Sequence, residues 1–306
     1  MKTKVITICA VVMMMLASVS MADMTEVYST NFDSMTPGKI TGQDGWKDNE
    51  ITYSETITTD AAHSGSQSWF LGMNATNAMV ESIQSPKVPF AGESFSSRSI
   101  STTNKAISYE FWFKTKADEA NHENLYINSS LAQEASIRQS WFCIMDGDKW
   151  GSANENNTSG QIGMGPFADD ELRIVAYGQG AVSAAGAYSQ ALVWGDWYKI
   201  RVDALFKDGF DGANDLVTYT LWDASMSQVW TATMTSWERP YYSGVYEPQQ
   251  AGYNAAVNMV SFDWSTFNTP AGIYIDDFKI MTAVPEPMTL ALLSLGGLLL
   301  RRKRRA

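Results

Sequence analysis

The chain has 306 residues, of which 45% are hydrophobic, 12% aromatic and only 18% charged, and its formal net charge is -11. This composition excludes a long disordered chain, a collagen and a coiled coil. An acidic surface repels phosphate, which argues against nucleic acid as a partner. Two histidines and two cysteines leave little material for a zinc site or a cysteine–histidine nucleophile.

Residues 1–22 have the three parts of a secretory signal peptide. Lys2 and Lys4 form the charged region, and an almost uninterrupted apolar run follows from Val5 to Leu16. Ser20-Met21-Ala22 supplies the small-x-small pattern that a signal peptidase needs, so we expect cleavage before Asp23. A buried first helix or a membrane anchor is the alternative, but the run is shorter than the ~20 residues of a membrane span.

The segment from 23 to 283 is predicted to be one all-β domain. It sustains no period of 3.6, whereas several segments alternate with a period of two, as strands do. The segments predicted as strands are 107–114, 197–204, 216–222, 228–234, 256–264 and 272–281. In 197–204, we expect Lys199, Arg201 and Asp203 to face water, with the residues between them facing the core. Residues 216–222 and 228–234 predict a hairpin around Asp223-Ala224-Ser225.

Many strands joined by polar turns indicate a two-sheet antiparallel jelly-roll sandwich. A split into two domains near residue 160 is the alternative.

Several short motifs occur in an order that matches a known superfamily. Asn31-Phe32-Asp33 precedes Gly42-Gln43-Asp44-Gly45-Trp46, and His63-Ser64-Gly65-Ser66-Gln67-Ser68 leads into a strand that starts at Trp69. Later come the strands around 109–113, 195–200 and 273–278. This order resembles the concanavalin A-like lectin/glucanase superfamily in its laminin-G-like form. The resemblance implies a two-sheet jelly roll, often with calcium and often with a glycan on its concave face.

The C-terminal segment 284–306 has three parts. A Pro-Glu-Pro motif at Pro285, Glu286 and Pro287 is followed by an apolar stretch from Met288 to Leu300 and then by the basic run 301–305. This tail resembles the PEP-CTERM sorting signal of exported bacterial proteins. The resemblance implies recognition and removal by an exosortase, in bacteria that make exopolysaccharide. The stretch predicts a short apolar helix that anchors the chain in the membrane before processing, with the basic run on the cytoplasmic side. A plain anchor that is never cut is the alternative.

Processing at both ends would change the charge and the cysteine content. Seven of the 22 basic residues lie in the two end segments, so residues 23–287 would keep 15 basic residues against 33 acids, a charge of -18. Cys143 would be the only cysteine left, which excludes an intramolecular disulfide. Because its neighbours are apolar, we expect a buried, inert thiol.

The sequence offers no catalytic pair that we recognise. Glucanases of this superfamily place carboxylates about 5 Å apart on one strand in a Glu-x-Asp-x-x-Glu pattern, and that spacing is absent. Asp276 and Asp277 are neighbours in a predicted strand, so we expect them to point to opposite faces. His63 and His122 have no nucleophile motif nearby and are predicted to be surface or turn histidines.

Two acidic clusters are candidates for a structural calcium ion, which takes six to eight oxygen ligands. The first comprises Asp208, Asp211, Asn214 and Asp215, and its spacing favours a solvated turn. In the second, Asp33 follows the first strand while Asp276 and Asp277 lie on the last. First and last strands commonly pair in jelly rolls, so these three carboxylates could meet and recruit a cation.

Aromatic residues in loops are candidates for stacking on sugar rings. Trp150 lies in one polar loop, and Trp237, Tyr241 and Tyr242 lie in another. The alternative is that they cover the ends of the sandwich. Trp112, Trp222 and Trp230 lie within predicted strands and are expected to pack in the core or on a sheet face.

Two functions follow from these patterns. The first is a non-catalytic protein of the cell envelope or extracellular matrix, sorted by its tail, with a structural role or weak glycan binding beside exopolysaccharide. The alternative is a polysaccharide-active hydrolase or lyase with an unrecognised site.

Overall fold

The computed structural model describes residues 24–47, 54–72, 83–89, 91, 105–116, 125–132, 140–145, 171–177, 187–206, 215–235, 257–264 and 272–283. One compact unit spans Glu26–Thr282; the other comprises Met1–Thr25 and Ala283–Ala306, of which only Met24, Thr25 and Ala283 are described. All the regular structure in these ranges is strand, which confirms the all-β prediction. Within the same ranges, no helix has the length and hydropathy of a membrane span.

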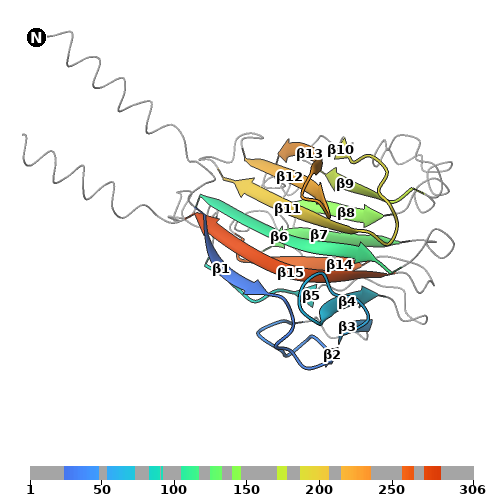
Figure 1. Cartoon of the computed structure of the whole chain (residues 1–306). Coiled ribbons are helices and arrows are strands. Elements are labelled where there is room, and N and C mark those ends of the chain that lie inside the picture. Colours follow the sequence, from blue (N-terminus) through green and yellow to red (C-terminus); the bar gives the residue numbers. More distant parts are fainter. Residues whose placement is uncertain are drawn as a thin grey trace, which may run out of the picture. The chain divides into compact units, whose positions relative to one another are not determined.

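The larger sheet has nine strands (Figure 1). Its order is β13 (Gln228–Thr235), β12 (Leu216–Asp223), β11 (Trp197–Leu205), β6 (Ala106–Thr115), β15 (Gly272–Ala283), β4 (Ser68–Gly72), β3 (Ser54–Thr58) and β2 (Gly38–Lys39). β1 (Met24–Thr30) pairs with β15, so the first and last strands lie side by side, as the jelly-roll prediction requires.

The smaller sheet has six strands. Its order is β10 (Ala187–Tyr188), β9 (Arg173–Tyr177), β8 (Trp141–Met145), β7 (Tyr126–Ala132), β14 (Met259–Trp264) and β5 (Ile83–Gln84). Every pairing in this sheet is antiparallel. The prediction of a two-sheet antiparallel sandwich is confirmed.

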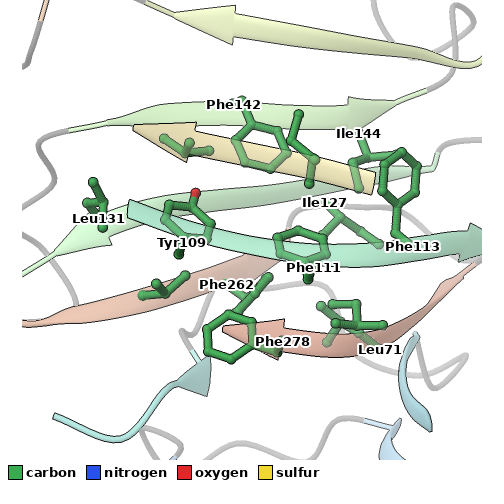
Figure 2. Close-up of a cluster of buried hydrophobic side chains, with 14 of the residues drawn as sticks. Leu71, Tyr109, Phe111, Phe113, Ile127, Leu131, Phe142, Ile144, Phe262 and Phe278 are labelled. Atoms are coloured by element: carbon green, nitrogen blue, oxygen red, sulfur yellow. The ribbon is translucent and has the colours of Figure 1, made fainter. Parts of the chain in front are cut away.

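One core fills the space between the sheets. Side chains at alternate positions of β6 point into it, because successive residues of a strand face opposite sides. They meet residues of β7, β8 and β14 from the other sheet, as Figure 2 shows for Phe111, Phe142 and Phe262. Replacing such a ring with alanine costs about 3–5 kcal/mol, so this cluster supplies much of the stability.

Two buried hydroxyl groups join the sheets through hydrogen bonds. Tyr109 Oη on β6 lies 3.0 Å from Ser129 Oγ on β7. The Tyr219 hydroxyl on β12 contacts the backbone of Trp141 on β8, accepting from its N–H at 3.1 Å and donating to its carbonyl at 3.2 Å. Burial raises the pKa of both tyrosines, so both stay protonated and can donate.

The predicted hairpin is present. β12 and β13 pair from Leu216 opposite Thr235 to Trp222 opposite Gln228. Asp223 Oδ1 accepts the N–H groups of Ser225 and Ser227 and the Ser225 hydroxyl, which stabilises the turn. These bonds, the Ser225 hydroxyl first, lower the pKa of Asp223.

The predicted facing of β11 is also confirmed. Tyr198, Ile200, Val202 and Ala204 are buried, and the charged residues between them are half-buried on the other face, here called the outer face of the nine-stranded sheet. There Lys199 Nζ lies 2.7 Å from Glu110 Oε1, and Arg201 Nε lies 2.8 Å from Asp203 Oδ1. Cys143, on β8, is fully buried, as expected.

Candidate functional site

A bulge in β15 places two neighbouring carboxylates on the same side of the sheet. Ile275 and Phe278 both belong to the core, so Asp276 and Asp277 between them both lie outside it. The register with β6 shifts in this segment, and Asp277 has a φ of 47°. A bulge inserts one residue and so breaks the alternation of faces. The expectation that Asp276 and Asp277 point to opposite faces was therefore wrong.

Both carboxylates bind one segment, residues 61–67, here called the 61–67 loop. Asp276 Oδ2 accepts the backbone N–H groups of His63 at 2.7 Å and Ser64 at 2.9 Å. Asp277 Oδ1 accepts the Ser64 hydroxyl at 2.6 Å, and its Oδ2 lies 2.8 Å from His63 Nδ1. The loop is thus fixed to the last strand by four polar contacts.

Asp33 holds the other end of the same loop. Its Oδ1 accepts the N–H groups of Ser66 at 2.8 Å and Gln67 at 3.0 Å, and the Ser66 hydroxyl at 3.1 Å. Its Oδ2 accepts from Asn31 Nδ2 at 3.0 Å. The three carboxylates that the sequence analysis grouped therefore converge on one loop.

Hydrogen-bond donors surround these carboxylates. The Asp277 N–H donates to Asp276 Oδ1 at 2.7 Å, so each of the six oxygens accepts a bond or lies beside a ring nitrogen. The bonds, that from the Ser66 N–H first, lower the pKa of Asp33. Asp276 behaves differently: burial raises its pKa to about 6, and the charge of Asp277 adds to the effect.

Calcium ligation at Asp33, Asp276 and Asp277 stays a prediction. Within the described ranges, no group of three or more His, Cys, Asp or Glu side chains could hold a metal ion. Thermal denaturation with and without a chelator tests the prediction, and an unchanged midpoint would remove it. Of the other acidic cluster, only Asp215 is described, and it is buried.

His63 is held by more than its turn. Its ring stacks on Trp112 with the centroids 3.8 Å apart and the planes at 14°, and it meets Trp197 edge-on at 5.5 Å. Asp277 contacts its Nδ1, which favours the tautomer with the proton on Nδ1 and a lone pair on Nε2. The side chain keeps 27% of its surface exposed. The turn position is as predicted, but the packing on a sheet-face tryptophan had no sequence signal.

A polar pocket of about 300 Å³ opens beside the bulge. Seven residues from β1, the segments after it and β15 line the pocket: Ser29, Thr30, Asn31, Ser34, Asp44, Asp277 and Lys279. Its volume lies at the lower end of the range for small-molecule sites. The Tyr28 hydroxyl donates to Asp44 Oδ2 at 2.8 Å and accepts from the buried Trp46 Nε1 at 2.9 Å, so the core fixes one wall. The pocket offers both donors and acceptors, but no aromatic lining.

Most pocket residues were missed by the sequence analysis. Only Asp277 was predicted to be a site residue, as a metal ligand, while Asn31 and Asp44 were named only within motifs, because short polar residues beside a strand also suit an ordinary turn. The predicted glycan-binding residues Trp150, Trp237, Tyr241 and Tyr242 lie outside the described residues, as do His122, the signal peptide and the sorting motif Pro285, Glu286 and Pro287. Trp112 packs on a sheet face, as expected.

No known family and no curated relative matches the sequence. Similar solved structures include peanut lectin with a nine-residue peptide (TM-score 0.48, 9% identity, 83% of this chain and 96% of that one) and lectin II from Ulex europaeus (0.49, 12%, 85% and 100%). Another is an alginate lyase in complex with alginate tetrasaccharide (0.46, 8%, 82% and 95%). At these identities and TM-scores, they establish neither a family nor a ligand for this chain.

Proposed function

We propose that this is an exported, non-catalytic protein of the cell envelope or extracellular matrix that binds a glycan in the polar pocket beside β15. The observation that carries the glycan proposal is the pocket itself, with hydroxyl, amide, carboxylate and ammonium groups in one small opening.

The lining suits sugar hydroxyl groups, each of which donates one hydrogen bond and accepts others. Asp44 and Asp277 can accept from a sugar, Lys279 can donate to it, and Asn31 can do both. Asp277 is fixed by the 61–67 loop and Asp44 by Tyr28. Groups held in advance lose little freedom on binding, so a small polar site can still bind measurably.

A binding experiment tests the pocket. A glycan array with the secreted chain would find candidates, and calorimetry would compare the wild type with Lys279→Met and Ser34→Ala. We expect Lys279→Met to weaken binding by at least about tenfold and Ser34→Ala by about fivefold, since a hydrogen bond to a charged group contributes about 1.5–3 kcal/mol and a neutral one about 1 kcal/mol. Lys47→Met, an exposed lysine outside the pocket, is the control. Absence of any binder would leave only the structural role.

The sorting proposal rests on the sequence of the two ends. An epitope-tagged chain should be cleaved and reach the cell surface or medium in a host that has an exosortase, and should stay membrane-bound in a host that lacks one. Pro285→Ala with Pro287→Ala should block the cleavage. Identical fractionation in both hosts would overturn this proposal and leave the glycan proposal standing.

A second candidate function is polysaccharide cleavage. It is favoured by His63, whose Nδ1 contacts Asp277 and whose Nε2 has no partner among the described residues. A carboxylate that orients a histidine in this way is typical of general bases. Incubation with polysaccharides would then release reducing ends or unsaturated products, and His63→Ala would abolish the release. A chain that yields no product from acidic and neutral polysaccharides would exclude this candidate.

A further inference from the structure

A row of four side chains crosses the outer face of the nine-stranded sheet, apart from the polar pocket. Trp197, Lys114, Tyr274 and Phe70 lie directly opposite one another on β11, β6, β15 and β4. Their strand neighbours, such as Tyr198 and Phe113, face the core, so the row faces outward. Adjacent strands lie about 4.8 Å apart, and the row is therefore roughly 14 Å long. A row of this length can contact consecutive units of a polymer.

The end of the row at Phe70 is built on two glycines. Gly72 and Gly272 are paired across β4 and β15, and a Cβ atom on either would lie within 2.5 Å of the Phe70 ring. The ring therefore lies over the backbone of both strands. Tyr274 packs against it at 5.1 Å, and Lys116 Nζ lies 4.7 Å from its centroid. Phe70 and Tyr274 are 9% and 7% exposed, so they form the floor of the row. The cation–π contact places the exposed Lys116 ammonium over this floor.

Lys114 lies within the row, and Lys116 reaches over its Phe70 end. Lys114 and Lys116 are two positions apart on β6 and just beyond it, so they share a face. Among the described residues neither forms an ion pair, whereas Lys199 and Arg201 on the same face are paired with Glu110 and Asp203. The charge of Asp60 acts on Tyr274, so the two ammonium groups of Lys114 and Lys116 outweigh it and leave a local positive charge in a chain of net charge -11.

The two aromatic residues beside Lys114 add recognition groups of another kind. The Tyr274 hydroxyl has no hydrogen-bond partner in the described part of the chain. Burial raises the pKa of Tyr274, and the charge of Asp60 adds to the effect, which keeps this hydroxyl protonated as a donor. Trp197 is half-buried and offers part of a flat apolar ring at the other end of the row.

We propose that this row binds an acidic polysaccharide whose sugars carry carboxylates. Ammonium groups of Lys114 and Lys116 pair with two carboxylates along the chain, Trp197 packs on a sugar ring, and Tyr274 donates to a hydroxyl. The row shares no residue with the polar pocket, so binding at the row can be tested independently of glycan binding in that pocket. Nucleic acid is disfavoured because a chain of net charge -11 repels its dense phosphate charge.

Binding of oligogalacturonate, a chain of uronate sugars, tests the proposal by calorimetry. Lys114→Gln with Lys116→Gln removes both charges but keeps polar side chains of similar length. We expect at least about tenfold weaker binding, since each charge-assisted bond contributes substantially. Lys87→Gln removes the charge of an exposed lysine elsewhere and should bind as the wild type does. Raising the salt from about 50 to about 500 mM should weaken wild-type binding.

Three results would overturn the proposal: unchanged affinity in the double variant, equal binding of a neutral oligosaccharide of the same length, or equal, lysine-dependent binding of single-stranded DNA. Thermal unfolding of each variant checks that the fold is intact. Lys279→Met in the polar pocket should leave oligogalacturonate binding unchanged, which separates this site from the proposed function.

Discussion

A Cβ atom on Gly65 would lie 1.7 Å from Oδ2 of Asp33, so the 61–67 loop passes this carboxylate at a distance that only glycine allows. Gly65 also has a φ of +63°, in the left-handed region that glycine adopts at little cost. The close approach lets Asp33 accept the N–H groups of the next two residues, Ser66 and Gln67. Backbone conformation and carboxylate binding are thus coupled at one position.

Gly65→Ala should therefore destabilise the protein by about 2–4 kcal/mol. The left-handed conformation costs about 1–2 kcal/mol in an alanine, and displacing Asp33 removes charge-assisted hydrogen bonds. Urea unfolding measures the loss. Gly195→Ala is the matched control, because Gly195 has a φ of +77° and a Cβ atom added there would meet nothing within 4 Å. It should lose only the backbone share, and an equal loss in both variants would show that Asp33 contributes nothing.

Asp276 should stabilise the folded protein more in mild acid than at neutral pH. Its folded pKa of about 6 is above the unfolded value of 3.8, so its contribution is fully present below pH 3.8 and is lost as the pH rises through 6. The difference in unfolding free energy between the wild type and Asp276→Asn should grow by about 2 kcal/mol from pH 7 to pH 4.5. Denaturant unfolding at both pH values measures it.

Asp33 has the opposite sign and provides the control. Its lowered pKa contributes stability above pH 3.8 that disappears as the pH falls through the folded value. The gap between the wild type and Asp33→Asn should therefore be constant from about pH 7 to pH 5 and shrink below about pH 4. If the two variants had the same pH dependence, the assignment of the opposite shifts to burial and hydrogen bonding would be wrong.

The strands were predictable because alternation is a local property. In β11, every second side chain is buried, as the pattern from Trp197 to Ala204 indicated. The pairing of the first and last strands followed from the expected jelly roll, and it brings Asp33 and Asp276 to one loop. Nothing in the sequence, however, indicated that the partner of both would be a loop some 30 residues from Asp33 and 213 from Asp276.

The bulge in β15 was harder to predict. Ile275 and Phe278 are both apolar and three positions apart, which is the only trace that a strand with period two is interrupted between them. An acidic pair at that point suits either an exposed strand or a turn. The conformation of this acidic pair depends on the 61–67 loop, which supplies donors to both Asp276 and Asp277. Such a long-range contact has no signature in the local sequence.

The stacking of His63 on Trp112 should be visible in fluorescence. His63→Ala removes the ring that covers Trp112 at 3.8 Å and the contact with Asp277, so we expect a red-shifted emission and a loss of about 1–2 kcal/mol. The shift should be absent when Trp112 is replaced with Phe. Ser64→Ala removes a different bond to Asp277 and should leave the emission unchanged. A red shift in Ser64→Ala would indicate that the whole loop detaches.

The two glycines beneath Phe70 should differ in their tolerance of a methyl group. In Gly72→Ala the three atoms nearest to the new Cβ all belong to the Phe70 ring, the first at 2.2 Å, and the ring can rotate away. In Gly272→Ala it also meets the backbone carbonyl oxygen of Leu71 at 2.7 Å, which cannot move without disturbing the pairing of β4 and β15. Overpacking costs about 1–3 kcal/mol, and we expect Gly272→Ala at the upper end and Gly72→Ala at the lower. Urea unfolding of the two variants measures the difference. Equal losses would mean that the ring, rather than the backbone, sets the limit at both positions, and that Phe70 is fixed too firmly to turn aside.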